Sequence, residues 1–391
     1  AGECLSFLGA GCWQHHVPAV CDEINRRGEF LTAYAGEPYD DHGRFQALFE
    51  YASMMGELLN MDAVNVPTYD GYQAAAPSIR MACRLTGRSQ ELVARNLGWE
   101  KLSRIRDYCK PGIEIRTVGF NAETGGLDLA ELESAITSET AVLLKVHTSN
   151  FRIRGFTEAV STADLAALAA EHDLMVVRDL GSGATGLPRS PIPADEPTMA
   201  DEVRAGSDVV ASSGDKLLAG PQAGILVGRR EVIGRLAANP LYRALRPGKL
   251  TIAALSETLL AHLEGNAVEA LPALRMLGMD AKLLDRAARS LAERLSKAAG
   301  HWATVECRPG GSETGGGSIP DTPLETTLVS VSPERAPAHV VERRLRGGHP
   351  IIMVRVQDGK LLIDPRTLMP GEDDHLIERM VEALAQEGEA A

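Results

Sequence analysis

The middle of the chain alternates short apolar runs with longer amphipathic ones. The amphipathic stretch 162–172 (TADLAALAAEH) places Leu165, Leu168 and Ala169 on one face of a helix. The apolar runs predict buried strands, at residues 141–146 (AVLLKV), 174–177 (LMVV), 208–211 (DVVA) and 224–227 (GILV). Strands that alternate with helices of this length predict parallel pairing through right-handed crossovers. The pattern therefore indicates an α/β fold whose large domain is doubly wound around a mostly parallel sheet.

Beyond residue 228 the pattern changes twice. Long helical stretches come first, at residues 231–238, 251–263 and 281–299. After residue 300 strands and helices mix, and the pattern predicts strands at 326–331, 351–356 and 360–363 and a last helix at 374–386. The dipeptide Asp358-Gly359 can adopt the positive φ angles of a tight turn between the last two strands. This part of the chain predicts a small α+β domain.

Segments rich in glycine and proline, at 182–197 and 308–323, predict loops. No period of about 20 to 50 residues recurs, which excludes repeat architectures. We therefore expect an N-terminal segment (1–40), a large doubly wound domain (41–265), and a linker helix with a small C-terminal domain (266–391).

Composition narrows the classes of function. The 391 residues carry 40 Lys and Arg against 53 Asp and Glu, and the formal net charge of −13 disfavours a broad nucleic-acid-binding surface. Apolar residues make up 44% of the chain, which is enough to bury a sizeable core. No apolar run approaches the roughly 18 residues of a spanning helix, and the first residues do not resemble a signal peptide. The 6 scattered cysteines form no CxxC pair, so we expect no metal site and a reducing, cytoplasmic location.

The most informative feature is an acid at one predicted strand end and a lysine at another. Asp179 ends the apolar run MVVRD and precedes glycines, and Lys216 follows the run DVVASSGD. Because the carboxyl ends of the strands face the ligand crevice of a doubly wound sheet, both side chains are expected in one cleft. Pyridoxal phosphate chemistry requires such a pair: the lysine forms a Schiff base, and the carboxylate keeps the pyridine nitrogen protonated. The alternative for each residue alone is structural: Asp179 caps a loop, and Lys216 is exposed in a turn.

The chain from about residue 143 to the C-terminus resembles bacterial selenocysteine synthase, the L-seryl-tRNA(Sec) selenium transferase family. The matching stretches are LLKVHTSNFRIRGFTEAVS, VVRDLGSGA, SSGDKLLAGPQAGILVG, LYRALRPGKLTIAAL, GGGSIPDTPLE and DGKLLIDPRTLMP. The resemblance implies a fold-type I transferase with the architecture of aspartate aminotransferase. It also implies pyridoxal 5'-phosphate as the cofactor.

The first part of the chain, up to about residue 136, resembles a different branch of the same superfamily. The stretches FLGAGCWQHHVPAV and GEFLTAYAGEPYDDHGRFQALFEYASMMGELLNMDAVNVPTYDGYQAAA are similar to the N-terminal subunit of glycine dehydrogenase (decarboxylating), the P-protein. That family is also of fold type I. The two resemblances therefore agree on fold and cofactor but imply different reactions.

The resemblance assigns the centre of the site. It implies that Lys216 is the Schiff-base lysine, that Asp179 is the partner of the pyridinium nitrogen, and that Asn150 hydrogen-bonds the phenolic oxygen of the cofactor. Ser213 is expected to bind the phosphate. Asp215 is expected to orient or tune the lysine.

Further cofactor contacts are expected around this centre. Ser182 lies just beyond Asp179, and His147 either contacts the ring or is a structural histidine at a strand end. A helix N-terminus suits the phosphate, and the P-protein resemblance assigns that role to Gly71, Tyr72 and Gln73. The alternative is that this segment is the start of an ordinary capped helix.

An aromatic ring normally stacks on the pyridine. The P-protein family has a His-Pro-Glu triplet where this chain has Leu97-Gly98-Trp99-Glu100, so Trp99 is the expected replacement, with a core or interface role as the alternative.

Four arginines are expected to bind substrate. A guanidinium binds a carboxylate with two parallel hydrogen bonds, and the superfamily takes this arginine from the C-terminal domain. Arg366 is the preferred candidate and Arg355 the second. The selenium transferase resemblance implies that Arg243 and Arg246 line the site and receive an anionic donor, whereas a solvated helix face is the plain alternative.

These assignments predict a pyridoxal-phosphate-dependent transferase or lyase. The expected reaction removes the Cα proton of a serine-like substrate and replaces its β-substituent through an aminoacrylate. Decarboxylation of glycine and a non-catalytic subunit are the alternatives. The tRNA-binding module of the selenium transferases has no counterpart in this sequence, so tRNA binding is not predicted. Because sites of this fold are normally completed by a second subunit, we expect a homodimer or larger homo-oligomer.

Overall fold

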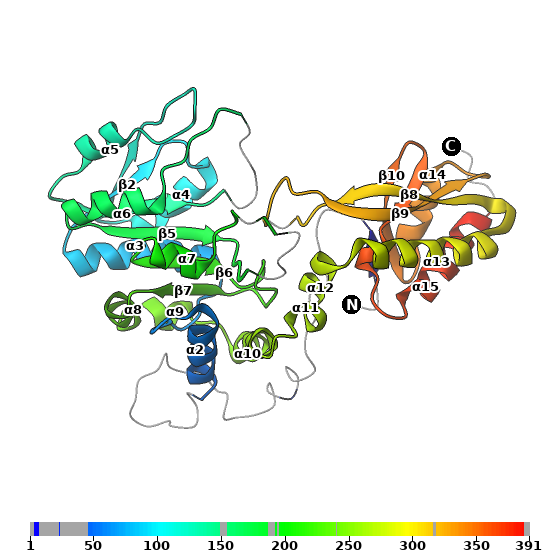
Figure 1. Ribbon diagram of the computed structural model, residues 1–391, viewed down its shortest axis with the longest axis horizontal. Helices are drawn as coiled ribbons and strands as arrows, with labels where there is room; N and C mark the ends of the chain where they lie inside the picture. Colours follow the sequence, from blue (N-terminus) through cyan, green and yellow to red (C-terminus); the bar gives the residue numbers. More distant parts are fainter. Residues whose placement is uncertain are drawn as a thin grey trace. The chain divides into compact units, whose positions relative to one another are not determined.

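The computed structural model describes residues 4–7, 23, 46–148, 155–186, 192–193, 195–239, 241–315 and 318–386 (Figure 1). The chain forms two compact units. The larger unit contains His15–Leu187 and Ala194–Leu271, and the smaller unit contains Ala1–Gln14, Pro188–Pro193 and Pro272–Ala391.

A six-stranded sheet forms the centre of the larger unit. Its order is β3-β2-β4-β5-β6-β7, and every neighbouring pair is parallel except β6 and β7. The strands are β2 (Gln90–Ala94), β3 (Glu114–Val118), β4 (Thr140–Val146), β5 (Met175–Gly181), β6 (Val209–Ser213) and β7 (Gly224–Gly228). The strands predicted in the middle of the chain are thus β4 to β7, and the α/β fold class is confirmed.

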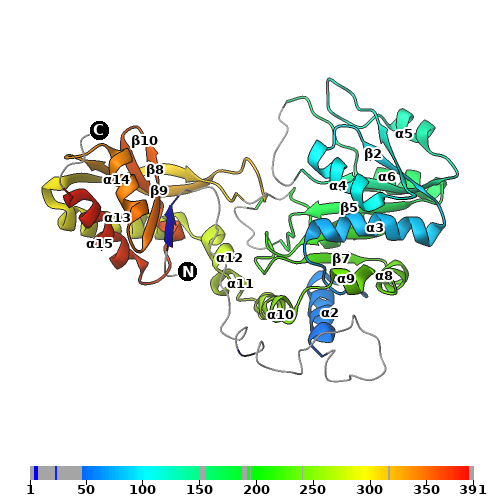
Figure 2. The same ribbon diagram turned by 180° about the vertical axis from the view of Figure 1, so that it is seen from behind.

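Helices cover both faces of this sheet, so its central strands are buried on both sides. Val142 and Val177 pack with Ala74 of α3, whereas Leu143 packs with Leu165 of α6. Figure 2 shows α3 across the face that is hidden in Figure 1, where α6 and α7 lie in front. The helices of the larger unit are α2 (Gln46–Leu59), α3 (Gly71–Thr86), α4 (Trp99–Cys109), α5 (Leu129–Ala135), α6 (Thr162–Glu171), α7 (Met199–Arg204), α8 (Arg230–Ala237), α9 (Leu241–Leu245), α10 (Lys249–Leu263) and α11 (Ala267–Ala270).

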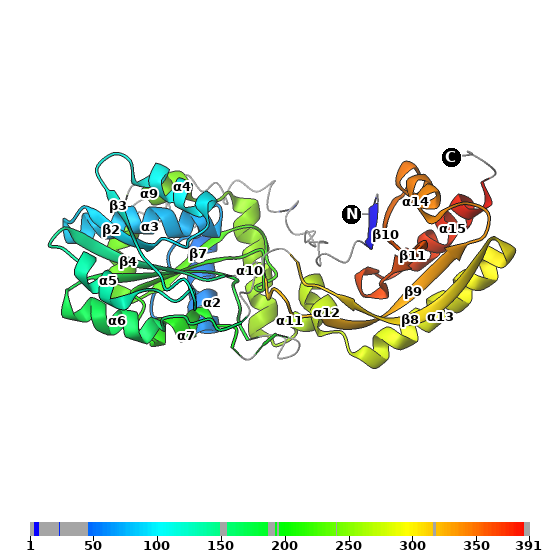
Figure 3. The same ribbon diagram turned by 90° about the horizontal axis from the view of Figure 1, so that it is seen from above.

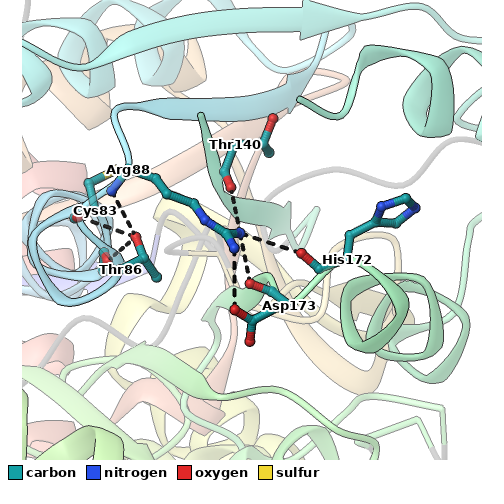
Figure 4. A network of polar contacts seen from close by, with 7 residues as sticks. Cys83, Thr86, Arg88, Thr140, His172 and Asp173 are labelled. Carbon is teal, nitrogen blue, oxygen red and sulfur yellow. Dashed lines mark hydrogen bonds and ion pairs between the residues drawn. The ribbon is translucent and has the colours of Figure 1, made fainter. Parts of the chain in front are cut away.

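Polar contacts fix the amino-terminal edge of the sheet. Arg88 lies just before β2, and its Nη1 donates to the carbonyl oxygens of Thr140 at 3.0 Å and Asp173 at 2.8 Å (Figure 4). Its Nη2 lies 3.2 Å from the Asp173 carboxylate. One guanidinium therefore joins the starts of three neighbouring strands. The opposite edge, where the strands end, is left for the loops that carry the predicted site.

The smaller unit is a five-stranded sheet with helices on one face. The strand order is β1-β10-β11-β9-β8, and α13 runs alongside β8 and β9 (Figure 3). The strands are β1 (Cys4–Phe7), β8 (Ala303–Ser312), β9 (Leu324–Pro333), β10 (Ile351–Gln357) and β11 (Lys360–Ile363). The helices are α12 (Pro272–Gly278), α13 (Ala281–Ala299), α14 (Ala338–Gly347), α15 (Glu372–Ala385) and the 3₁₀ turns η2 (Gly300–Trp302) and η3 (Pro365–Thr367).

Most of the predicted elements of this unit are confirmed. Helix α13 has the predicted bounds, and the turn between β10 and β11 has positive φ at Asp358 (53°) and Gly359 (70°). The aliphatic side chains of α13, α14 and α15 pack on one face of the sheet, around Val329, Val331 and Ile363.

Two features of the smaller unit differ from the prediction. The loop expected over 308–323 is wrong in its first part, because β8 continues to Ser312. Pro309 is tolerated there since β8 is an edge strand, which needs hydrogen bonds on one side only. Strand β1, which the hydrophobic pattern did not predict, pairs in parallel with β10 from Cys4↔Ile351 to Phe7↔Val354.

Candidate functional site

The carboxyl ends of β4, β5 and β6 bring the predicted acid and lysine together. Asp179 lies in β5 between Val146 of β4 and Ala211 of β6, and is 7% exposed. Its carbonyl oxygen accepts a hydrogen bond from the backbone N–H of His147 at 2.8 Å. The register between β5 and β6 shifts between Asp179 and Gly181, which marks a bulge at the carboxyl end of β5.

Lys216 lies in the loop that follows β6, and backbone hydrogen bonds hold this loop. The N–H of Leu217 donates to the carbonyl of Ser182 at 2.9 Å, which ties the residue after Lys216 to the end of β5. Gly214 donates to Ala223 at 2.8 Å and closes the loop. The fold therefore places Asp179 and Lys216 on adjoining segments of the same sheet edge.

The N-terminus of α3 packs directly against the end of β6. A Cβ atom at Gly71 would overlap the Oγ of Ser213 and lie 2.9 Å from the carbonyl oxygen of Ser212, so only glycine fits. The preceding segment is fixed on β7 by two hydrogen bonds between Thr68 and Gly224, both 2.8 Å long. The free N–H groups at the start of a helix favour an anion, so this arrangement suits the phosphate predicted there.

Buried hydroxyl groups line the same edge without partners. Ser182 and Ser212 are both fully buried, and neither Oγ has a hydrogen-bonding partner. Buried polar atoms are normally paired, so the two orphaned hydroxyls at the ends of β5 and β6 are unusual and available to a polar ligand. Together with Asp179 and Lys216 they form a donor set that fits pyridoxal 5'-phosphate: a lysine amine, a carboxylate, and donors for a phosphate.

The structure also pairs His147 with a buried carboxylate that the sequence did not predict. Nε2 of His147 lies 3.3 Å from Oε1 of Glu196, whose side chain is 4% exposed. Glu196 lies in a loop predicted from its prolines, 49 residues along the chain, and the local sequence does not reveal that it meets a strand end. A carboxylate beside a histidine orients the ring.

Buried charges also lie on the other face of the strand ends. Lys145 and Arg178, partners in the β4–β5 register, alternate with Val146 and Asp179 and so point to the α6 side. Nε of Arg178 lies 3.1 Å from Glu202. Burial and the Arg178 charge lower the pKa of Lys145 to about 8. These groups brace the strands behind Asp179.

The other predicted cofactor contacts are placed as follows. Ser213 and Asp215 are half-buried on either side of Gly214. Trp99 begins α4 after the end of β2, and its 77% exposure leaves the indole accessible for stacking. The remaining three predicted contacts lie wholly or partly outside the described residues: Asn150, and the side chains of Tyr72 and Gln73, whose backbone forms the first turn of α3.

The predicted substrate arginines fall in both units. In the larger unit, Arg243 lies in α9, with its side chain outside the described residues, and Nη1 of Arg246 donates to the Pro247 carbonyl at 3.0 Å. In the smaller unit, Nη1 of Arg355 in β10 donates to Gly311 at 3.4 Å, while its Nε and Nη2 are buried without a partner.

Arg366, the preferred carboxylate arginine, is engaged inside the smaller unit. It is 3% exposed, and its Nη1 and Nη2 donate to the carbonyl oxygens of Met276 at 2.6 Å and Glu325 at 2.7 Å. Its backbone N–H donates to the buried carboxylate of Asp364 at 3.0 Å. The guanidinium thereby joins α12 to the start of β9, and a substrate carboxylate would have to displace these contacts.

No group of three or more His, Cys, Asp or Glu side chains suited to a metal ion occurs among the described residues. Within the same residues no helix has both the length and the apolar character needed to cross a membrane.

Comparison with known proteins agrees with both resemblances. The family model "L-seryl-tRNA selenium transferase" matches residues 103–369, and the model "Glycine cleavage system P-protein" matches residues 2–180. A relative from Nitratidesulfovibrio vulgaris, an L-seryl-tRNA(Sec) selenium transferase, is 40% identical over 74% of this chain and 67% of its own length. The relative of the same name from Desulfovibrio desulfuricans is 38% identical over 78% of this chain and 70% of its own length.

The fold also matches a solved structure. D-glucosaminate-6-phosphate ammonia-lyase superposes with a TM-score of 0.62 over 98% of this chain and 96% of that one, at 18% identity. The fold class predicted from the sequence, fold type I with a large doubly wound domain and a small α+β domain, is confirmed.

Proposed function

Because the chain belongs to the L-seryl-tRNA selenium transferase family, we propose that it replaces the β-substituent of a serine-like aminoacyl substrate. The protein is a pyridoxal 5'-phosphate enzyme of fold type I. The observation that carries the proposal is the extent of the family match. Residues 103–369 include Asp179, Lys216 and all four predicted substrate arginines, and the structure gathers the first two at one sheet edge.

The residues that would hold the cofactor follow from the site. Lys216 would bind its aldehyde carbon, Asp179 would keep a proton on its ring nitrogen, and the start of α3 at Gly71, with Ser213, would bind its phosphate. When bound, pyridoxal 5'-phosphate supplies an electron sink for the bonding pair left when a Cα bond breaks.

The chain's own residues move the protons. Nζ of Lys216 is the base that takes the Cα proton and later returns it, and Asp215 beside it orients the amine. In the net reaction the Cβ–O bond of the seryl group breaks, a bond from Cβ to the incoming nucleophile forms, and the hydroxyl leaves as water with the proton that the nucleophile releases, while the Cα proton is restored. Arg243 and Arg246 are assigned to the incoming anion, because arginine binds oxyanions in a fixed geometry.

The engagement of Arg366 bears on the substrate class. A free amino acid carries an α-carboxylate, whereas an ester-linked seryl group does not. Since the guanidinium of Arg366 donates to Met276 and Glu325, the structure supports an ester-linked substrate. The relatives are named for seryl-tRNA, so we propose a tRNA carrier, in contrast to the expectation from the sequence. A homodimer and a cytoplasmic location complete the proposal.

Trapping the cofactor tests the site. Incubation with pyridoxal 5'-phosphate, reduction with borohydride and peptide mapping should place the adduct on Lys216, with Lys216→Ala as the unlabelled control. If peptide mapping of the reduced protein finds no adduct on Lys216, the enzymatic proposal is refuted. Turnover is then compared between free serine, a seryl ester and seryl-tRNA, with selenophosphate as the anion. Equal turnover of free serine and seryl-tRNA would refute the ester-linked substrate class.

The P-protein match supports glycine decarboxylation as a second candidate. That match covers residues 2–180, which include Gly71 and Asp179 but end before the Lys216 loop. Exchange of labelled bicarbonate into the carboxyl group of glycine distinguishes the two reactions. Exchange without any β-replacement would favour decarboxylation, and β-replacement without exchange would exclude it.

A further inference from the structure

Helix α10 packs beneath the loop that carries Lys216. Two polar residues of this helix, Thr258 and His262, are four positions apart and therefore lie on the same face, and each is 5% exposed. Both meet the loop between Gly214 and Gly220. Polar side chains in such a buried position need a specific partner, and here the loop supplies it.

His262 makes the direct contact. Its Nε2 lies 3.0 Å from the carbonyl oxygen of Leu218, two residues after Lys216. Burial lowers the pKa of His262, with the Leu218 contact acting in the opposite direction. A neutral ring that faces a carbonyl must carry its proton on Nε2, so Nε2 donates. The Nδ1 atom is buried without a hydrogen-bonding partner, so this single bond fixes the ring.

Thr258 shapes the contact one turn earlier. Its Oγ1 donates to the Ala254 carbonyl at 2.7 Å within the helix. A Cβ atom at Gly220 would lie 3.3 Å from both Cγ2 and Oγ1 of Thr258, closer than ordinary van der Waals contact. The loop therefore lies directly on the helix, and glycine at position 220 allows it.

The loop needs such support. It has no regular secondary structure, and Ala219 adopts a φ of 61°, which is unfavourable for a residue with a Cβ atom. Its backbone bonds from Leu217 to Ser182 and from Gly214 to Ala223 anchor it on β5 and near β7. The carbonyl of Leu218 contacts His262 on α10 instead. Without that donor the buried carbonyl would lose its partner, and the loop would gain freedom next to Lys216.

We propose that His262 is a positioning residue for the reaction: by donating to the Leu218 carbonyl it holds the Lys216 loop on α10. The importance of this contact for catalysis rests on the proposed role of Lys216. The contact itself is independent of that proposal. The lysine amine has to approach the same ligand atom in every turnover, and a loop that is held on a helix keeps the position of the amine constant.

Two amide substitutions separate this role from general stability. In His262→Gln the side-chain nitrogen reaches about as far as Nε2, so the bond to Leu218 can reform. In His262→Asn the nitrogen corresponds to Nδ1 and falls short of Leu218. Both variants bury a neutral amide of similar chemistry. Leu165→Ala serves as the control, because Leu165 packs with Leu143 and Val176 in a cluster separate from that of α10, and its truncation destabilises the unit away from the loop.

Hydrogen–deuterium exchange of the cofactor-free protein measures the loop directly. In His262→Asn, amides in the peptide spanning residues 213–224 should exchange about tenfold faster, which corresponds to the loss of one hydrogen bond. His262→Gln should restore slow exchange, and Leu165→Ala should leave this peptide unchanged. If both amide variants exchange alike, or if the control shows the same increase, the proposal is wrong.

A second measurement connects the loop to the chemistry. The rate at which pyridoxal 5'-phosphate becomes trapped on Lys216 by borohydride should fall about tenfold in His262→Asn and recover in His262→Gln. Unchanged trapping in His262→Asn, despite faster exchange, would overturn the positioning role. If the wild-type protein is not labelled at Lys216 at all, the proposed function fails, while the exchange result still decides whether His262 holds the loop.

Discussion

The larger unit should become less stable as the pH rises, because a carboxyl group is buried in its sheet. Glu91 lies in β2 and is fully buried. Its Oε2 faces the Sγ of Cys109 at 3.9 Å, and its Oε1 has no hydrogen-bonding partner. Burial raises the pKa of Glu91 from 4.5 to about 8, and the hydrogen bond from Cys109 lowers it by a smaller amount. Cys83, whose pKa is also raised by burial, is the other titratable group whose charge interacts with it.

The sign follows from the two pKa values. Between pH 4.5 and about 8 the folded protein keeps the proton on Glu91, whereas the unfolded chain releases it. The stabilising contribution is therefore complete below pH 4.5 and is lost as the pH rises to about 8. At about 1.4 kcal/mol per pKa unit, the full loss is ~5 kcal/mol. Glu91→Gln keeps the shape of the protonated acid and does not titrate.

Urea unfolding at pH 5, 7 and 9 tests this directly. Relative to the wild type, Glu91→Gln should gain unfolding free energy as the pH rises, by ~1.4 kcal/mol per pH unit until the gain levels off. Glu133→Gln, on the exposed face of α5, should show no such trend. A difference between Glu91→Gln and the wild type that stays constant from pH 5 to pH 9 would refute the reasoning, because it would mean that the carboxyl is solvated or paired.

Four further variants test residues of the predicted site. Gly71→Ala should weaken pyridoxal 5'-phosphate binding at least tenfold, as measured by fluorescence titration, because its Cβ would overlap Ser213 where the helix start meets β6; unchanged affinity would mean that the phosphate binds elsewhere. Arg366→Gln should lower the unfolding free energy by roughly 2–5 kcal/mol in urea, since two buried carbonyls lose their donor. Arg355→Gln should change KM more than it changes the unfolding free energy. If urea unfolding and kinetics instead show that Arg355→Gln loses more stability and Arg366→Gln has the larger change in KM, the assignments of the two arginines are reversed. Asp179→Asn should lower kcat by a factor of about a hundred or more, followed in single turnovers, while the cofactor still becomes trapped on Lys216; full activity would exclude the ring-nitrogen role.

The cofactor pair was accessible from the sequence because its signals are local. Each of the two residues follows an apolar run that forms a buried strand, and parallel strands must end at one edge of the sheet. The acid at 179 and the lysine at 216 are thereby brought together by topology alone, before any side-chain contact is considered. The roles of the individual contacts around them stay predictions.

The contacts that brace the site were not accessible in this way. Glu196 meets His147 across 49 residues, and His262 meets Leu218 across 44, and neither residue differs locally from an ordinary polar side chain. Arg366 matches a superfamily position by sequence, yet its partners are carbonyl oxygens of α12 and β9. Hydrogen bonds to backbone groups depend on where the chain passes and leave no trace in residue type.

By itself the sequence determined the α/β class, most of the strands and helices, and the pyridoxal phosphate chemistry, because hydrophobic periodicity and strand ends are properties of short segments. Only the tertiary structure decided that Cys4–Phe7 completes the sheet of the smaller unit beside β10 and that a proline-containing segment continues β8. Both depend on pairing between distant parts of the chain. An isolated strand has no stability of its own, and a proline is acceptable in a strand only when its missing N–H faces no neighbour, as at the edge that β8 occupies.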